Sequence, residues 1–259
     1  SITPRVKEFS DHDSDVYCVL HNNNKQIVSG SNDKTIRTFD IEKGECIHKI
    51  TSNQEIKSLA WWKQGQYLIE GGYGAPFDIH IRQWNQHDHT SQDHGSIVRT
   101  LKGHTDIIYV LVVDESNDQL LSCSEDLTIR LWDLNTGLEI KQFKGHTYCV
   151  YSLCKVDKNL LVSGSADESL KFWNIESGEC VHTIEKAHSN SVMALLYSAS
   201  NQVLISASSD NTIKVWDLKM GETADKCALK YTFENPYGQS CYAIAFLDGE
   251  NDGTRVLVG

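Results

Sequence analysis

Histidine, serine and aspartate recur in this sequence in sets that could support nucleophilic chemistry. In a hydrolase, histidine takes the proton from a serine hydroxyl while aspartate orients the imidazole ring. Three sets are complete, and each ends in a tryptophan: His104, Ser122, Asp126 and Trp132; His146, Ser163, Asp167 and Trp173; His188, Ser206, Asp210 and Trp216. Because three copies in one chain are not three active sites, a structural role is favoured over catalysis.

These sets belong to a longer internal repeat of about 43 residues. An aromatic residue followed by Asp or Asn closes each unit. The successive anchors lie 45, 48, 41 and 43 residues apart: Phe39, Trp84, Trp132, Trp173 and Trp216. A histidine stands 27 or 28 residues before four of the anchors. Such a period indicates an array of units that bury their faces against their neighbours.

Short apolar or alternating runs between these positions predict β-strands. Examples are Leu160–Ser163 and Val203–Ser206, which are bounded by turn-forming residues. A glycine also follows the Asp or Asn of most anchor pairs by four residues, as in Asp133 to Gly137. Glycine there suits a turn with positive φ that leads into a fourth strand.

The Gly-His pairs at residues 103–104 and 145–146, together with the closing Trp-Asp pairs, resemble the WD-repeat (β-transducin-like) family of β-propellers. The resemblance extends over essentially the whole chain. It implies an all-β fold of four-stranded antiparallel blades around a central channel, with the innermost strand of each blade following the Gly-His element. We expect a propeller of six or seven blades.

A single propeller domain is expected over residues 1–259, because no Pro-rich linker divides the chain. Its repeat units are expected at approximately 11–50, 51–101, 102–143, 144–185 and 186–233, with a partial unit at 234–259. Residues 1–10, with Val6–Phe9 as the strand, are expected to supply the outer strand of the last blade. The chain is therefore expected to be cut inside that blade.

The resemblance also implies a role for the three sets of four residues. In WD-repeat proteins this tetrad is a buried chain of hydrogen bonds from indole to hydroxyl to imidazole to carboxylate. Breaking it partly would leave buried polar groups unpaired, at a cost of about 1–3 kcal/mol each. The first unit keeps His12, Ser29 and Asp33, but Phe39 removes the indole donor.

The second unit departs further from the repeat. It lacks Gly-His, Glu70 stands where the serine is expected, and Asp78 follows Glu70 by eight residues instead of four. The inserted segment Gly71–Pro76 could be a phosphate-binding loop, but no Lys-Ser or Lys-Thr follows it. We expect a flexible connection.

A second insertion, Gln86–His94, carries three histidines and two aspartates. These residue types could ligate zinc or copper. Their spacing fixes no geometry, however, and the polar composition favours a solvated, disordered loop. We therefore expect no metal at His87–His94, and no cofactor elsewhere.

Six residues that begin the innermost strands are the candidates for partner binding. By resemblance they surround the channel mouth on the top face, where many propellers bind peptides: Tyr17, Lys57, Tyr109, Tyr151, Met193 and Tyr242. Tyrosine and methionine supply contact area of the kind enriched at binding hot spots. The alternative is that these side chains pack on one another and line a water-filled channel.

The charge balance narrows the classes of partner. The chain has 24 basic and 35 acidic residues, for a net charge of −11, which opposes approach to phosphate backbones and anionic lipid. The apolar run Ile107–Val113 is far below the roughly 18 residues that a membrane span needs. Nucleic acid and membrane are therefore not expected as partners. Scattered cysteines inside apolar runs favour the cytoplasm, with the nucleus as an alternative.

These observations favour a non-enzymatic scaffold that binds a peptide segment or partner protein on its top face. No small-molecule substrate is expected. The alternative is a substrate-recognition domain within a larger enzyme or ubiquitin-ligase subunit, linked to a kinase or an F-box. Propellers that read phosphorylated degrons carry arginines at the six positions, and this chain has none there.

Overall fold

The fold is built entirely from strands in the part of the chain that is described. The structure is a computed structural model that describes residues 8–22, 25–85, 91–218, 227–235, 238–246 and 256–259. Its regular elements are the strands β1 to β22. The predicted all-β class is confirmed. The same residues contain no helix long and apolar enough to span a membrane.

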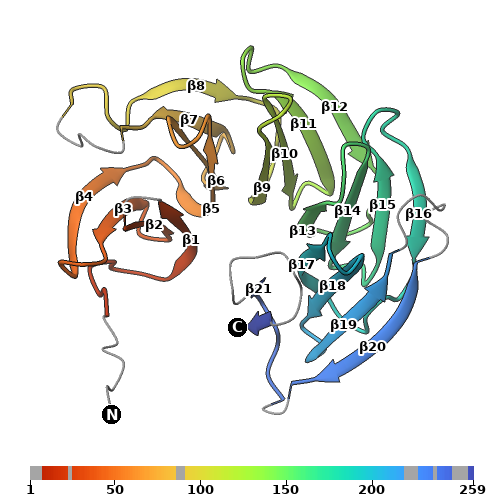
Figure 1. The fold of residues 1–259 in the computed structure, drawn as a ribbon. Coiled ribbons are helices and arrows are strands. Elements are labelled where there is room, and N and C mark those ends of the chain that lie inside the picture. The colour runs from red at the N-terminus through yellow and green to blue at the C-terminus, as the bar shows by residue number, and fades with distance from the viewer. Residues whose placement is uncertain (1–7, 23–24, 86–90, 219–226, 236–237, 247–255) are drawn as a thin grey trace, which may run out of the picture. The chain divides into compact units, whose positions relative to one another are not determined.

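Five four-stranded antiparallel sheets account for most strands (Figure 1). The first contains β1 (Val16–Asn22), β2 (Gln26–Ser31), β3 (Thr35–Asp40) and β4 (Glu45–Thr51). The second contains β5 (Glu55–Trp62), β6 (Tyr67–Tyr73), β7 (Ile79–Gln83) and β8 (Ile97–Leu101). The third contains β9 (Ile108–Asp114), β10 (Gln119–Ser124), β11 (Thr128–Asp133) and β12 (Glu139–Lys144).

The remaining strands form two further four-stranded sheets and one hairpin. The fourth sheet contains β13 (Val150–Lys155), β14 (Leu160–Ser165), β15 (Leu170–Asn174) and β16 (Cys180–Ile184). The fifth contains β17 (Val192–Ser198), β18 (Val203–Ser208), β19 (Thr212–Asp217) and β20 (Ala228–Glu234). The hairpin pairs β21 (Ile244–Phe246) with β22 (Val256–Val258). Within each four-stranded sheet the strands follow chain order, as expected for propeller blades.

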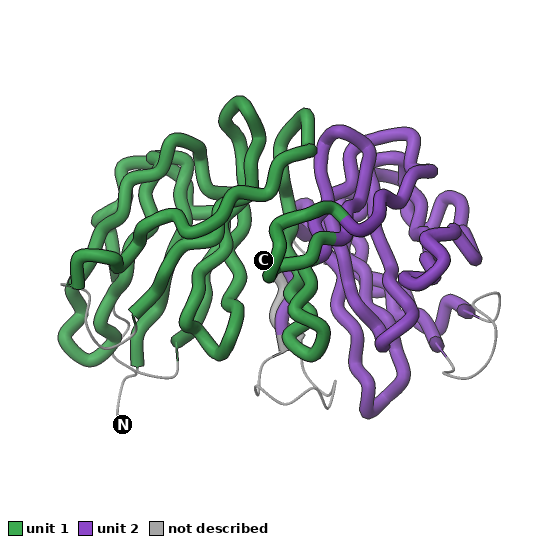
Figure 2. The backbone as a smooth tube through the Cα atoms, turned by 90° about the horizontal axis from the view of Figure 1, so that it is seen from above, with its two compact units in different colours: residues 1–120, 132–139 green, residues 121–131, 140–259 purple. Residues whose placement is uncertain are grey.

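The chain divides into two compact units (Figure 2). Unit 1 comprises residues 1–120 and 132–139 and holds the first two sheets. Unit 2 comprises residues 121–131 and 140–259 and holds the fourth and fifth sheets and the hairpin. The border between the units falls within the third sheet. A single domain over the whole chain stays a prediction.

Apolar side chains fill the space between neighbouring sheets of each unit. In unit 1, Val28 and Ile36 of the first sheet pack with Ile56 and Leu68 of the second. In unit 2, Phe172 of the fourth sheet packs with Trp216 of the fifth. Removing this apolar surface from water stabilises the stacking of one sheet on the next.

Turns between the third and fourth strands have the predicted backbone conformation. The glycines at this position have positive φ: Gly44 at 78°, Gly137 at 79° and Gly178 at 82°. Each glycine amide donates to the carbonyl of the Asp or Asn four residues before it, at 2.8 Å. Glycine reaches this conformation without steric cost.

Strand pairing in the second sheet assigns a different anchor residue from the one that the sequence predicted. Trp216 pairs with Leu204 in the fifth sheet, and Trp173 pairs with Leu161 in the fourth. The corresponding residue of the second sheet is Arg82, which pairs with Leu68. The assignment of Trp84 as the anchor was wrong by two residues, because the Trp-Asn pair follows an insertion that shifts the spacing.

The glycines of the second sheet also differ from the predicted flexible connection. Gly71 and Gly72 lie inside β6, where Ser58 and Ile56 are their partners on β5. A Cβ atom on Gly72 would lie 1.8 Å from the carbonyl oxygen of Glu55. These glycines therefore permit close strand pairing, and the flexible interpretation is wrong for Gly71–Tyr73.

The predicted outer strand Val6–Phe9 lies mostly outside the described residues. Phe9 is described, and its ring lies 4.9 Å from that of Phe39 between centroids. Phe143, on the outer strand β12, stands three residues before His146 as Phe9 stands before His12. Its ring packs 5.9 Å from that of Trp173. Phe9 thus makes the contact that an outer-strand residue makes in unit 2.

Candidate functional site

The partner-binding candidates lie at one edge of their sheets. The innermost strand of each sheet begins there, and the turn between the second and third strands lies there too, because the strands are antiparallel. We call this the top edge. The opposite edge, with the turns between the first and second and between the third and fourth strands, is the bottom edge.

β-bulges distinguish the candidate residues from the rest of the innermost strands. The pairing of β1 with β2 shifts between Val16 and Cys18, so that Tyr17 is the extra residue. The same shift occurs at Lys57, Tyr151 and Met193. A bulge leaves its extra residue outside the regular ladder and redirects its side chain.

Tyr242 adopts a related arrangement before β21. The amides of Tyr242 and Ala243 both donate to the carbonyl oxygen of Gly259, at 2.7 and 3.1 Å. Tyr242 is 61% exposed, and Tyr17 is 49% exposed. Tyr109, Tyr151 and Met193 are partly buried.

Tyr17 and Lys57 are brought together in unit 1. The Lys57 ammonium lies 3.4 Å from the centroid of the Tyr17 ring and donates to Asn32 Oδ1 at 2.9 Å. Tyr17, Lys57 and Tyr109 belong to unit 1, while Tyr151, Met193 and Tyr242 belong to unit 2. The Tyr17 ring therefore already accepts a cation on its face.

Two tetrads form continuous hydrogen-bond chains within unit 2. In the fifth sheet, the Trp216 indole donates to Ser206 Oγ at 2.8 Å, and Ser206 Oγ lies 2.7 Å from His188 Nε2. His188 Nδ1 lies 3.0 Å from Asp210 Oδ2. The fourth sheet repeats this chain through Trp173, Ser163, His146 and Asp167, with distances of 2.8, 2.6 and 2.7 Å.

The carboxylate sets the direction of the chain. An ionised Asp210 can only accept, so Nδ1 of the neutral His188 donates to it, and Nε2 accepts the proton of Ser206, whose oxygen accepts from the indole. Burial lowers the pKa of the His188 imidazole, which keeps it neutral. Burial alone would raise the pKa of Asp210, but hydrogen bonds from Thr212, the Ser189 amide and His188 lower it to about 2. The chain therefore ends in a carboxylate at the top edge.

The first sheet holds a variant of this arrangement, and the residues of the third set are divided between the two units. In the first, His12 lies 2.6 Å from Ser29 Oγ and 2.8 Å from Asp33 Oδ2, and no indole is present because of Phe39. In the third, the rings of His104 and Trp132 lie 6.0 Å apart between centroids. Ser122 and Asp126 of that set belong to the other unit.

An ion pair stands in place of the tetrad in the second sheet. Glu70 pairs with Leu59 as Ser206 pairs with Leu195, so the carboxylate occupies the serine position. Arg82 donates to both Glu70 oxygens, at 2.8 and 3.0 Å, and to the Gly95 carbonyl at 2.7 Å. Ser52 donates to Glu70 at 2.8 Å. Sequence reasoning identified Glu70 but missed Arg82 and Ser52.

Ser52 occupies the position of the missing histidine. Its amide donates to the carbonyl of Lys34, as the His188 amide donates to the carbonyl of Glu168. Asp78 lies one position before Ile79, where Thr212 stands before Ile213 in the fifth sheet. Asp78 therefore does not take the place of the tetrad aspartate.

The histidine-rich insertion is described only in part, since residues 86–90 lie outside the described residues. His94 Nδ1 accepts from the Asn85 amide at 3.0 Å, and the ring packs 4.5 Å from the rings of both Trp84 and His48. The prediction of a solvated loop is wrong for His94, because its ring packs on Trp84. Among the described residues no three His, Cys, Asp or Glu side chains gather as metal ligands.

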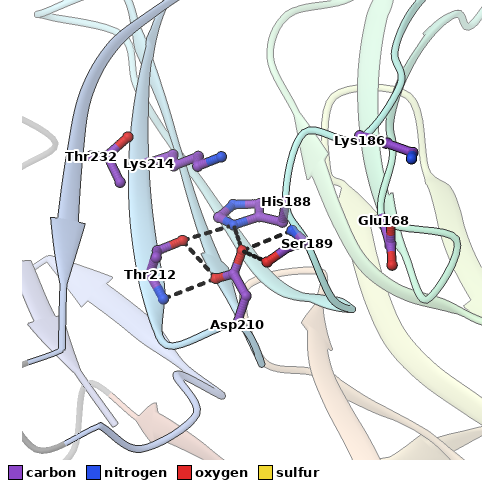
Figure 3. A pocket seen from close by; sticks show the side chains of 8 residues that line it. All are labelled: Glu168, Lys186, His188, Ser189, Asp210, Thr212, Lys214 and Thr232. Atoms are coloured by element: carbon purple, nitrogen blue, oxygen red, sulfur yellow. Dashed lines mark hydrogen bonds and ion pairs between the residues drawn. The ribbon is translucent and has the colours of Figure 1, made fainter.

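A polar pocket opens at the top edge of unit 2, beside the fifth-sheet tetrad (Figure 3). Its volume is about 430 Å³. It is lined by Glu168, Lys186, His188, Ser189, Asp210, Thr212, Lys214 and Thr232. The Asp210 carboxylate accepts hydrogen bonds from His188, Ser189 and Thr212 at this pocket.

The repeats match a known protein family. The profile described as WD domain, G-beta repeat, matches residues 3–40, 95–133, 137–174 and 178–217. These segments make up more than half of the chain. They leave out residues 41–94, which contain the second sheet up to β7 and its Glu70–Arg82 ion pair.

Curated relatives show the same kind of similarity. Protein tipD of Dictyostelium discoideum is 26% identical over 203 residues, which are 75% of this chain and 31% of that protein. Nuclear distribution protein nudF of Aspergillus niger is 27% identical over 194 residues, which are 73% of this chain and 42% of that protein. F-box-like/WD repeat-containing protein TBL1X of Mus musculus is 26% identical over 208 residues, which are 74% of this chain and 37% of that protein. The chain spans less than half the length of these relatives.

Proposed function

The chain belongs to the WD-repeat family, and from this premise we propose that it is a non-enzymatic scaffold that binds a peptide segment or partner protein at its top edge. Family membership and the relatives support a protein-interaction role. The binding edge, the partner and the absence of catalysis are our proposal. So are a cytoplasmic or nuclear location and the exclusion of nucleic acid and membrane.

The observation that carries the proposal is the series of β-bulges. At four innermost strands the extra residue of the bulge is a large side chain: Tyr17, Lys57, Tyr151 or Met193. Bulges are over-represented where a side chain is re-aimed for function. Aromatic and methionine side chains also give large contact area at interfaces.

The chemistry of this edge favours a basic partner. The chain has a net charge of −11, which attracts cationic segments. The contact of Lys57 with the Tyr17 ring demonstrates the geometry that a partner Lys or Arg would use on the other tyrosines. An acidic or phosphorylated segment would find no arginine at the bulge positions.

The second candidate function is substrate recognition within a longer protein, either an enzyme or a ubiquitin-ligase subunit. It is favoured by the relatives' lengths, of which this chain covers 31% to 42%. One relative is itself named as an F-box-like protein. Sequencing the full open reading frame separates this candidate from a free-standing scaffold.

Alanine substitutions at the two edges test the proposal. Affinity capture from cell lysate with mass spectrometry first identifies the principal partner. Tyr109→Ala combined with Tyr151→Ala should weaken its binding by at least about tenfold, since each aromatic contact contributes about 1–2 kcal/mol. Circular dichroism should show that the variant stays folded.

Glu42→Ala and Glu176→Ala provide the matched control at the bottom edge. Both residues lie in turns between the third and fourth strands of their sheets. We expect these changes to leave partner binding intact. Binding lost only with the bottom-edge changes would show that the proposed edge is wrong.

A further inference from the structure

The cation next to each tetrad aspartate differs between sheets. In the first sheet Arg37, which pairs with the tetrad residue Ser29, fills the space beside Asp33. Its Nη2 lies 4.0 Å from Asp33 Oδ2 and 3.9 Å from Asp13 Oδ2, and its Nε donates to Thr35 Oγ1 at 3.2 Å. A guanidinium is therefore held between an aspartate, a threonine and the residue that follows the tetrad histidine.

Lys214 is the counterpart of Arg37 in the fifth sheet, because it pairs with Ser206. Its ammonium turns away from the aspartate and donates to the Ala187 carbonyl at 2.6 Å. The pocket of Figure 3 opens beside it. Asp210, Thr212 and Ser189, which line this pocket, are the counterparts of the three residues around the Arg37 guanidinium.

The number of residues between strand β16 and His188 contributes to the opening of the pocket. Phe143 precedes His146 by three residues, but Ile184, the corresponding end of β16, precedes His188 by four. The extra residue lies in the segment Glu185–Ala187, where Lys186 has φ of 50°. The carbonyl of Ala187 is thereby available to Lys214, which leaves the space beside Asp210 empty of protein atoms.

Two lysines and two carboxylates balance across the pocket, but Asp210 lacks the cation that the first sheet places beside its counterpart Asp33. Lys186 and Glu168 carry opposite charges on the other side of the pocket (Figure 3). Lys214 is engaged with a backbone carbonyl. Among the described residues, Asp210 has the neutral His188 as its ring partner and no lysine or arginine in an ion pair.

We propose that this pocket receives the guanidinium of an arginine side chain from the protein partner, next to Asp210 and in the manner of Arg37 next to Asp33. This inference rests on the proposed scaffold function and names one side chain that the partner supplies. The hydroxyl of Thr212 would accept from the guanidinium, as Thr35 accepts from Arg37. An arginine fits this role better than a lysine because its planar fork reaches several acceptors at once.

Nuclear magnetic resonance on the whole chain provides the test, with N-acetylarginine amide as the probe. Saturable shifts are expected at the amides of Ser189 and Thr212, which both donate to Asp210. N-acetylcitrulline amide, which has nearly the same shape without the charge, should bind about tenfold more weakly. Inorganic phosphate should leave both amides unshifted.

Lys214→Arg is the decisive variant because it restores the residue type of the first sheet. Its own guanidinium should fill the pocket and abolish the shifts, while Lys171→Arg in the fourth sheet should leave them unchanged. Shifts caused by phosphate and not by arginine would overturn the proposal in favour of an anion site. Unchanged arginine binding in Lys214→Arg would also overturn it. The probe is a single amino acid derivative, so either result concerns this pocket alone. It does not decide the partner-binding test at Tyr109 and Tyr151.

Discussion

The second and fifth sheets place different chemistry at the same three positions. In the fifth sheet a neutral chain runs from Trp216 through Ser206 to His188. In the second sheet Arg82, Glu70 and Ser52 occupy the corresponding positions, and the two hydrogen-bond donors converge on one carboxylate. Both solutions satisfy the buried polar groups, but the second places a carboxylate and its cation at these three positions, whereas in the fifth sheet the carboxylate lies beyond them, on Asp210.

The difference shows how the replacements depend on one another. Glu70 is fully buried, and an ionised carboxylate there needs a charged donor, which an indole would not provide. Arg82 supplies that charge and replaces the tryptophan. In the fifth sheet the charge lies at the far end of the hydrogen-bond chain, on Asp210, which lines the pocket at the top edge.

The largest predicted effect comes from breaking the ion pair of the second sheet. Arg82→Ala should lower the free energy of unfolding by about 3–5 kcal/mol, because it leaves Glu70 buried without its cation. Chemical denaturation followed by tryptophan fluorescence measures this loss.

A paired substitution sharpens the same comparison. Glu70→Ser combined with Arg82→Trp restores the residue types of the fourth and fifth sheets and removes both charges. It should therefore cost less stability than Arg82→Ala alone. If the double variant is less stable than Arg82→Ala, the correspondence between the two networks is contradicted.

Changes to the tetrad should have smaller effects. Asp210→Ala or His188→Ala should lower the free energy of unfolding by about 1–3 kcal/mol, because the remaining members stay buried with a partner missing. Asp78→Ala should cost less, since Asp78 stands at the position of Thr212 and outside the Glu70 network. Equal losses at Asp78 and Asp210 in thermal unfolding would argue against this assignment.

The sequence predicted the repeating sheets well because period and turn residues act locally. Alternating strands and the glycine after most anchor pairs are short-range signals, and Gly137 has the expected positive φ. The anchor prediction for the second unit failed for the same reason, because the insertion places Trp84 at about the expected spacing. Only the pairing of β6 with β7 shows that Arg82 is the anchor.

The sequence predicted the positions of the candidate residues but not their side-chain contacts or the pocket. The six candidate positions follow from their place after each entry loop, whereas the contact of Lys57 with Tyr17 depends on the stacking of two sheets. The pocket beside Asp210 depends on the direction that Lys214 takes, which residue type does not decide. Ser52 gave no signal, because a lone serine is common in loops.

Site-specific photo-crosslinking tests directly whether the partner binds at the top edge. A photoreactive phenylalanine analogue would replace Tyr242 in one variant and Leu138, in a bottom-edge turn, in another. The two native side chains are similarly exposed, at 61% and 68%, so accessibility alone would not separate them. Crosslinks to the captured partner are expected from position 242, and none from position 138. Crosslinks from position 138 alone would contradict it.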